Sequence, residues 1–222
     1  MADKLYLGLQ YRLLRMDTTV DRDDLPPGIP DEVLPRDTED VSSGVGILLD
    51  YDSRDSKFYP HRGSFLSVNT NFAGETLGSD RNYQQYQVGY NLYRELGEDK
   101  IIAWRSTACF MGGDAPYYDL CMVGGESDAI RGYIGGQYRD DVSLSTQVEY
   151  RWRFHKRLGM VAFAGIGEVA PKLSEMNSEN ILPSVGAGIR FRASEEQRVN
   201  LSIDYAVGKD SNAWYFRIGE AF

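Results

Sequence analysis

Residues 143–154 read SLSTQVEYRWRF, the most strictly alternating stretch of the chain. Its even-numbered positions are Leu, Thr, Val, Tyr, Trp and Phe, and its odd-numbered positions are Ser, Ser, Gln, Glu, Arg and Arg. Side chains of a strand point to opposite faces in turn, so this strand has one apolar, aromatic face and one polar, charged face. A soluble sheet buries the apolar face in a core, whereas a membrane barrel turns it toward lipid.

Composition narrows the classes of protein that fit. The chain has 222 residues, enough for one domain or two small ones. Its formal net charge of −9 argues against a nucleic-acid partner, which needs a basic surface. No run approaches the ~18 apolar residues of a transmembrane helix. Met1-Ala2-Asp3 leads directly into the first expected strand without a signal peptide, so we expect a mature or truncated start.

The same alternation recurs in ten segments separated by residues rich in Gly, Asp, Ser and Pro. These expected strands are 4–15, 43–52, 64–73, 82–96, 100–112, 143–154, 159–171, 184–193, 198–208 and 212–222. Strands of globular proteins usually hold ~5–6 residues. A tilted membrane-spanning strand needs about 9–11, so the lengths favour a membrane protein.

The connections alternate in length along the chain. Those after the odd-numbered strands are mostly long, and those after the even-numbered strands are tight turns, except for residues 53–63. This is typical of outer-membrane barrels, whose short turns lie in the periplasm. We therefore predict an all-β fold: one antiparallel up-and-down transmembrane β-barrel domain spanning residues 1–222, with about 10 strands. It would lie in the bacterial outer membrane with both termini periplasmic.

The end of the chain carries a further signal. Trp214, Phe216 and Ile218 follow one another at two-residue steps, and Phe222 is the last residue. A terminal aromatic on a strand resembles the C-terminal signal by which outer-membrane barrels are recognised for insertion. Glu220 departs from that pattern, because a hydrophobic residue is usual there. The resemblance implies that the barrel-assembly machinery is a partner for the protein's own insertion.

Two segments resemble the BamA/TamA-type outer-membrane proteins, also called bacterial surface antigens. Residues 50–64 read DYDSRDSKFYPHRGS, and the family has a similar D-x-R-D stretch followed by an aromatic, Pro and Gly. The second segment, Ile130-Arg131-Gly132-Tyr133, resembles the family motif V/I-R-G-F/Y. The positions of the first segment that match are Asp52, Arg54, Asp55, Pro60 and Gly63.

The resemblance implies that residues 113–142 form a long extracellular loop that folds back into the lumen. Its arginine would pair with acids on the strands that follow, and we expect Glu149 to be the partner of Arg131. The family's usual second acid lies in an F-x-D-x-G stretch, where this chain has Gly165. Glu168 or another acid could replace it, or the clamp could have a single acid.

Family barrels have sixteen strands, and the ten expected here align with the last ten. The chain is then either a C-terminal part of a longer protein or a small barrel. A ten-stranded ring is geometrically permissible. An open sheet would expose two unpaired edges to lipid. We therefore expect closure of the sheet on itself or with a second copy, and a homo-oligomer stays open as an alternative.

The implied function is membrane-protein insertion or polypeptide translocation, without enzymatic chemistry or a cofactor and with outer-membrane lipid around the barrel. Two alternatives are a soluble ligand-binding β-barrel and a small outer-membrane lipid-modifying enzyme. The enzyme would need a nucleophile and base together, and neither His61 nor His155 lies in such a motif.

Two cysteines, Cys109 and Cys121, complete the candidate residues. They are too few for a zinc site without histidine partners close in sequence, so we expect no metal. A disulfide between them and a pair of free buried thiols remain equally open, depending on the redox compartment.

Overall fold

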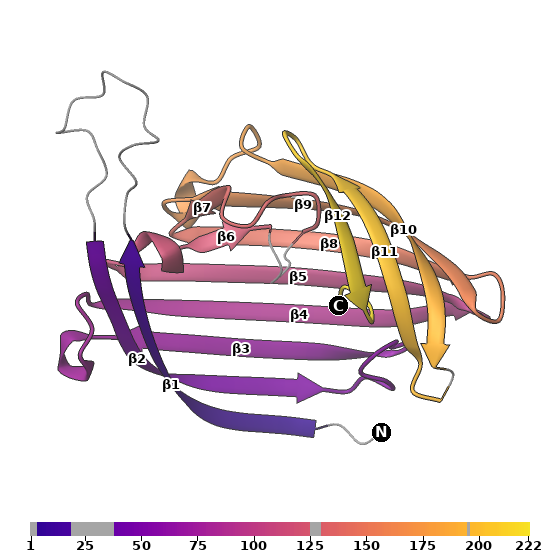
Figure 1. The fold of residues 1–222 in the computed structure, drawn as a ribbon, viewed down its shortest axis with the longest axis horizontal. Coiled ribbons are helices and arrows are strands. Elements are labelled where there is room, and N and C mark those ends of the chain that lie inside the picture. Colours follow the sequence, from indigo (N-terminus) through magenta and orange to yellow (C-terminus); the bar gives the residue numbers. More distant parts are fainter. Residues whose placement is uncertain (1–3, 19–37, 125–129, 195) are drawn as a thin grey trace.

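The computed structural model describes residues 4–18, 38–124, 130–194 and 196–222. Its ten long strands form one antiparallel sheet in chain order (Figure 1). They are β1 (Lys4–Thr18), β2 (Thr38–Asp52), β3 (Gly63–Ala73), β4 (Tyr83–Gly97), β5 (Lys100–Gly113), β8 (Val142–Arg153), β9 (Leu158–Ala170), β10 (Leu182–Ser194), β11 (Val199–Val207) and β12 (Asn212–Ile218). Each pairs with its neighbours in sequence, so the predicted all-β, up-and-down arrangement is confirmed.

Strand boundaries differ from the prediction mainly in the first hairpin. The alternation of sequence ends near Arg15 and resumes at Ser43, yet β1 and β2 pair continuously from Lys4↔Asp52 to Thr18↔Thr38. Most of the added residues are polar, and each is paired with a residue of the other strand. The length of β1 and β2 is therefore determined by their pairing with each other, and not by the alternation of their side chains.

The two faces of the sheet carry opposite chemistry, as the alternation predicts. Apolar side chains such as Leu9, Phe216 and Ile218 lie on the convex face and are 87%, 73% and 80% exposed. Polar side chains such as Gln147 and Glu149 face the concave side and are 1% and 0% exposed. A soluble protein buries its apolar face, so this inverted arrangement is that of a wall with lipid outside and a polar interior.

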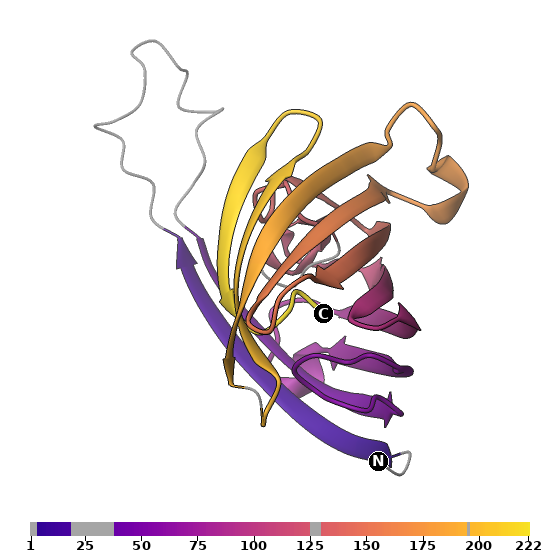
Figure 2. The same cartoon turned by 90° about the vertical axis from the view of Figure 1, so that its right-hand side faces the viewer.

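The sheet is curved but not closed, which corrects the expectation of a closed ring. Figure 2 shows a trough, with the C-terminus inside its curvature. Within the described residues β1 and β12 are the two ends of the strand order and do not pair with each other. Ten strands with this curvature describe an arc, and both hydrogen-bonding edges stay available for further strands.

The last strand is also shorter than predicted. β12 ends at Ile218, and Phe222 is not on a strand. Gly219 has φ of +108°, a left-handed value that breaks the pleat. Its carbonyl accepts a hydrogen bond from Ser202 Oγ at 2.8 Å, and its N–H donates to Asn200 O at 2.7 Å. The final residues consequently turn toward the concave side.

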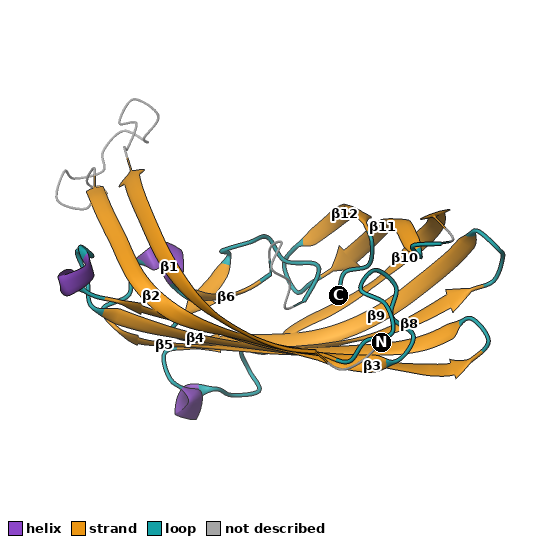
Figure 3. Cartoon of the chain, turned by 90° about the horizontal axis from the view of Figure 1, so that it is seen from below, coloured by secondary structure: helices purple, strands orange, loops and turns teal. Residues whose placement is uncertain are grey.

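The connection between β5 and β8 lies on the concave side of the sheet (Figure 3). Its described parts include a 3₁₀ turn, η2 (Tyr117–Asp119), and a two-stranded sheet of β6 (Cys121–Val123) and β7 (Tyr138–Asp140). Two further 3₁₀ turns, η1 (Glu75–Leu77) and η3 (Leu173–Glu175), lie in the connections before β4 and β10. None of the helices in the described ranges is long and apolar enough to cross a bilayer.

Candidate functional site

Arg131 lies at the centre of a buried ion-pair cluster on the concave side, which we call the clamp. Its side chain is 2% exposed. One guanidinium nitrogen donates to the carboxylate of Glu149 on β8, and Nη1 donates to Asp204 Oδ2 on β11 at 2.6 Å. The guanidinium carbon lies 3.4 Å from the ring centroid of Phe163, so the charged plane also stacks on an aromatic face.

Asp204 is therefore the second acid, at a position that the family pattern does not indicate. The loop packs so closely on Gly165 that a side chain would not fit there. A Cβ at this position would lie 2.8 Å from Ile130 Cγ2. Glu168, which we considered as the substitute, accepts a hydrogen bond from the Asn177 N–H at 2.7 Å instead. The clamp has two acids, and the second comes from a strand farther along the sheet.

The clamp continues as a chain of alternating charges. Beyond Asp204, Arg190 donates from Nη1 to Asp204 Oδ1 at 2.5 Å and from Nε to Glu220 Oε2 at 2.6 Å. Beyond Glu149, Arg151 donates from Nε to Glu149 Oε2 at 2.8 Å. The side chains of these residues are at most 3% exposed. Three acids face three arginines, so each buried charge has a partner of opposite sign, as burial requires.

The C-terminal tail joins the same network. Glu220, the departure from the insertion signal, also accepts a hydrogen bond from Asn200 Nδ2 at 2.6 Å. Arg151 Nη2 donates to the main-chain oxygen of Phe222 at 2.8 Å, and the Phe222 ring lies 6.5 Å from that of Tyr93. Trp214, Phe216 and Ile218 remain on the convex face, so Phe222 alone of the four signal residues turns inward.

The other motif residues dock the loop against β10 and β12. The N–H of Gly132 donates to Tyr215 Oη at 2.8 Å, and Gly132 has φ of +102°, which favours glycine. The Tyr133 hydroxyl donates to Pro183 O at 2.5 Å and accepts from the Lys209 N–H at 2.9 Å.

Ile130 and Tyr133 also form a small apolar cluster with Val123 and Leu182. The cluster packs on a stretch of wall without side chains, since a Cβ at Gly167 would lie 3.1 Å from Val123 and 3.2 Å from Ile130. Gly165 and Gly167 interrupt the alternation of β9, and they form the surface against which the loop packs.

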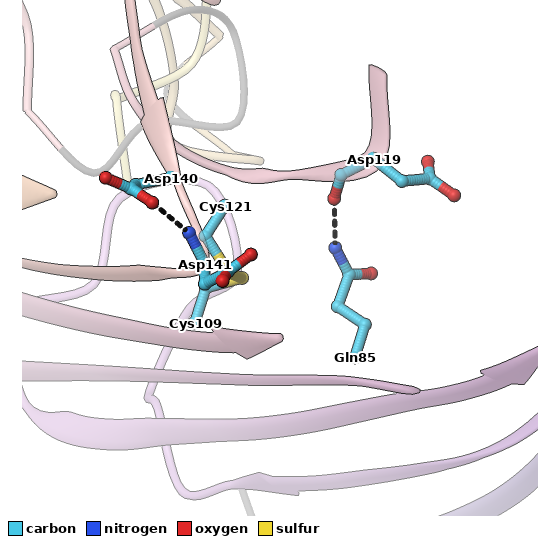
Figure 4. The surroundings of a disulfide bond; sticks show 6 residues. All are labelled: Gln85, Cys109, Asp119, Cys121, Asp140 and Asp141. Carbon is cyan, nitrogen blue, oxygen red and sulfur yellow. Dashed lines mark hydrogen bonds between the residues drawn. A yellow bond between two sulfur atoms is a disulfide. The ribbon is translucent and has the colours of Figure 1, made fainter. Parts of the chain in front are cut away.

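A second set of contacts holds the start of the loop. Cys109 on β5 and Cys121 on β6 form a disulfide (Figure 4). Asp119 accepts two hydrogen bonds from Arg12, at 2.6 and 2.7 Å, and one from the Tyr83 hydroxyl. Figure 4 also shows Gln85 Nε2 donating to the main-chain oxygen of Asp119, at 2.9 Å. The loop is thus tied to β1, β4 and β5 at one end and to β8–β12 at the other.

The strand-turn motif forms a second structured connection, between β2 and β3. Arg54 pairs with Asp52 through Nη2 at 2.9 Å. Asp55 accepts from the N–H groups of His61 and Arg62 at 2.8 and 3.2 Å, and pairs with Arg198 of the β10–β11 turn at 2.9 Å. Burial raises the pKa of the Asp55 carboxyl, but these hydrogen bonds outweigh it, and its pKa falls below the usual value.

The remaining motif positions shape the same turn. Pro60 is buried. Gly63 has φ of +102°, and a Cβ there would lie 2.3 Å from Ser53 O, so the position requires glycine. The β2–β3 turn therefore contacts the β10–β11 turn, through a pair of residues that are 143 positions apart in the chain.

Sequence reasoning missed Asp119, Arg190, Asp204 and Glu220 as parts of the loop anchorage. Alternation assigns Arg190 and Asp204 to the polar interior, but it carries no information on which interior residues meet. Glu220 had a usable signal: a carboxylate in a hydrophobic signal position needs a cation, and Arg190 is on a neighbouring part of the sheet.

No group of three or more His, Cys, Asp or Glu side chains suited to a metal ion occurs in the part of the chain that the structure describes. The six charged residues of the clamp neutralise one another, and the arrangement has the geometry of a fastening between loop and wall.

Comparison with known proteins places the chain in a family. The profile of a family described as "Omp85 superfamily domain" matches residues 4–222. The outer membrane protein assembly factor BamA of Nitratidesulfovibrio vulgaris (strain Hildenborough) is 27% identical over 205 residues, which is 84% of this chain and 25% of that protein. The crystal structure of BamA from Haemophilus ducreyi lacking POTRA domains 1–3 superposes with a TM-score of 0.67 at 14% identity. That match covers 96% of this chain and 50% of the solved one, so the chain spans a quarter to a half of these relatives.

Proposed function

The chain belongs to the Omp85 superfamily of bacterial outer-membrane proteins, and from that premise we propose that it serves the insertion of β-barrel proteins into the outer membrane. The proposal transfers the role in the name of the BamA relatives to this chain. It makes the protein a non-enzymatic scaffold, whose work is done by its wall, its edges and its lumen loop. Polypeptide translocation is the related activity that the same scaffold could serve.

The observation that carries the proposal is the pair of unpaired edges of the sheet. β1 and β12 each have one side that is not paired within the described residues, and their apolar side chains are well exposed. Unpaired N–H and C=O groups at membrane depth are costly, so these edges require partner strands. A client strand that adds to such an edge gains main-chain hydrogen bonds while its apolar face meets lipid.

When no client is bound, we propose that other strands satisfy these edges. They could come from a longer chain or from a second copy, and the fold leaves both open. The apolar convex face supports a position in the membrane over the soluble ligand-binding alternative, because Leu9 and Ile218 would otherwise lie in water.

The clamp has a supporting part in this proposal. It would hold the loop against β8–β12 so that the β12 edge keeps one curvature while client strands come and go. We further propose that the long loops face the exterior of the cell and the short turns the periplasm, with the first and last strands both starting or ending on the periplasmic side.

A folding assay in liposomes tests the proposal. A urea-denatured outer-membrane barrel protein is added to liposomes that hold this protein, and its folding is followed by heat-modifiable mobility on gels. We expect faster folding than in empty liposomes.

An unrelated closed barrel at the same density controls for general disturbance of the bilayer. Acceleration equal to that of the control barrel would contradict the proposal, because a closed barrel offers no edge.

A further inference from the structure

A cavity of about 530 Å³ lies at the short-turn rim of the sheet, away from the clamp. It is open to solvent and is bordered by the β4–β5 turn, the β8–β9 turn and the end of β10. Its lining residues are Asp99, Arg153, Phe154, His155, Lys156 and Arg192. Two arginines and one lysine thus line the cavity with a single carboxylate, in a chain whose net charge is −9.

Arg153 is the buried member of this group. Its side chain is 4% exposed, and its guanidinium lies 4.8 Å over the ring of Tyr59. Neither Nε nor Nη1 of Arg153 has a hydrogen-bond partner among the described residues. Asp99 Oδ1 lies 3.7 Å from Nε, which is beyond hydrogen-bond distance.

Arg131 of the clamp donates to two carboxylates, whereas Arg151 there has one buried donor, Nη1, without a partner. Buried guanidinium donors without an acceptor are costly, and native proteins rarely leave them so. Arg153 lines the cavity together with Lys156 and Arg192, and its two donors without a partner are themselves buried. A cavity lined by three basic side chains and a single carboxylate suits an anion.

Backbone hydrogen bonds fix the frame of the cavity. The Arg153 N–H donates to Asp99 O at 2.9 Å, and the Arg192 N–H donates to Arg157 O at 2.8 Å. These bonds join the three connected segments, so the cationic side chains start from fixed positions and little ordering is needed on binding.

The rim position suggests the source of the anion. Phe154, which lines the cavity, is 50% exposed, and Trp152 and Leu158 beside it are 39% and 41% exposed on the convex face. The apolar band of the wall therefore reaches the edge of the cavity, at the depth where lipid headgroups lie.

We propose that this cavity binds a phosphate group, and that the headgroup of an anionic phospholipid supplies it. Guanidinium groups match phosphate oxygens in geometry as well as in charge, and basic pockets beside a membrane bind anionic headgroups. Arg153 and Arg192 contact the phosphate from the lumen side, and Lys156 closes the site from the turn. The site is independent of the proposed insertion activity, since neither the clamp nor the free edges take part in it.

Lipid binding by the detergent-solubilised protein tests the inference. Native mass spectrometry counts bound phosphatidylglycerol and phosphatidylcholine, and titration with inorganic phosphate measures the headgroup chemistry alone. Lys156→Gln is the main variant because the side chain is exposed and its loss leaves the fold intact. Lys172→Gln is the matched control, an exposed lysine in the connection before β10 at the opposite rim.

We expect saturable binding of one phosphatidylglycerol in preference to phosphatidylcholine. Removing one charge-assisted contact in Lys156→Gln weakens it about tenfold, Arg153→Gln weakens it more, and Lys172→Gln leaves it unchanged. Asp99→Asn should bind more tightly, because the one opposing carboxylate is gone.

The arms of the experiment distinguish the two sources of phosphate. Inorganic phosphate that competes only at concentrations far above those of the lipid supports the headgroup, whereas equal strength assigns the site to free phosphate. Binding that is equal for both lipids, or that responds equally to Lys156→Gln and Lys172→Gln, would overturn the inference.

Discussion

Arg131 Nη1 and Asp204 Oδ2 lie 2.6 Å apart although 73 residues separate them in the chain. The other partner of Arg131, Glu149, is on β8, and two strands lie between β8 and β11. In a flat sheet three strand spacings of about 4.8 Å would separate these acids by ~14 Å. One guanidinium reaches both because the wall is curved, so the clamp and the curvature depend on each other.

Truncation of Arg131 should destabilise the protein strongly. Arg131→Ala leaves Glu149 and Asp204 buried beside fewer cations, and breaking a buried pair in this way costs about 3–5 kcal/mol. We expect a lower unfolding midpoint in urea and faster proteolysis within residues 113–142. Arg62→Ala serves as control, because it removes an ion pair with Glu95 from a side chain that is 73% exposed. Equal effects of the two variants would contradict the clamp.

The charge chain predicts coupling between residues that do not touch. Glu220 contacts Arg190 and not Arg131, but Arg190 and Arg131 both donate to Asp204, which links the two. A double-mutant cycle of Glu220→Gln and Arg131→Lys, measured by urea unfolding, should give an interaction energy of at least ~0.5 kcal/mol. Strictly additive effects would mean that the tail and the loop are held separately.

Gly165 should not tolerate a side chain. A Cβ at Gly165 would lie 2.8 Å from both Ile130 Cγ2 and Thr146 O, and overpacking of this kind costs about 1–3 kcal/mol. Gly165→Ala should lower the melting temperature, whereas Gly97→Ala has nothing within 4 Å of the new Cβ and should leave it nearly unchanged. A neutral Gly165→Ala would show that the loop does not pack on β9 as described.

The disulfide should restrain the first part of the loop alone. Opening the 12-residue link in Cys109→Ser removes a constraint worth ~3 kcal/mol in the unfolded chain. Limited proteolysis followed by mass spectrometry should then show new cleavage near Asp119 and Cys121, with Arg131 still protected by its own ion pairs. Cleavage at both places would mean that the loop is held as one unit.

Acid should weaken the tie between the strand-turn motif and the β10–β11 turn. The folded-state pKa of Asp55 is lowered, so its stabilisation is present above its unfolded pKa of about 3.9 and is lost as the pH falls through the folded value. The difference in melting temperature between the protein and Asp55→Asn should be constant above about pH 5 and shrink below about pH 4. A difference in melting temperature that grows as the pH falls would contradict a lowered pKa of Asp55.

Strand positions and faces followed from the sequence because period-two alternation is a local property. SLSTQVEYRWRF places Glu149 and Arg151 on one face whatever the rest of the chain does. The pairing of Arg131 with Glu149 followed from the family resemblance, since the motif and the strand after it are close in sequence.

Contacts that depend on curvature could not be predicted in this way. Asp204 reaches Arg131 across two intervening strands, and the amount of bending that allows it is not encoded in any single strand. Phe222 was placed on the last strand because alternation continues past Ile218, but Gly219 and the pairing of Glu220 with Arg190 redirect the chain. The long-range ion pair, and not the local alternation, determines where the end of the chain lies.

Quenching of tryptophan fluorescence tests the central claim, the inverted arrangement of the two faces, most directly. Trp104, Trp152 and Trp214 are all on the convex face, 39%, 39% and 63% exposed. In vesicles, lipids brominated along their acyl chains should quench most of the emission, and aqueous iodide should quench little. Strong quenching by iodide with none by brominated lipid would contradict a wall that faces the membrane with its apolar side.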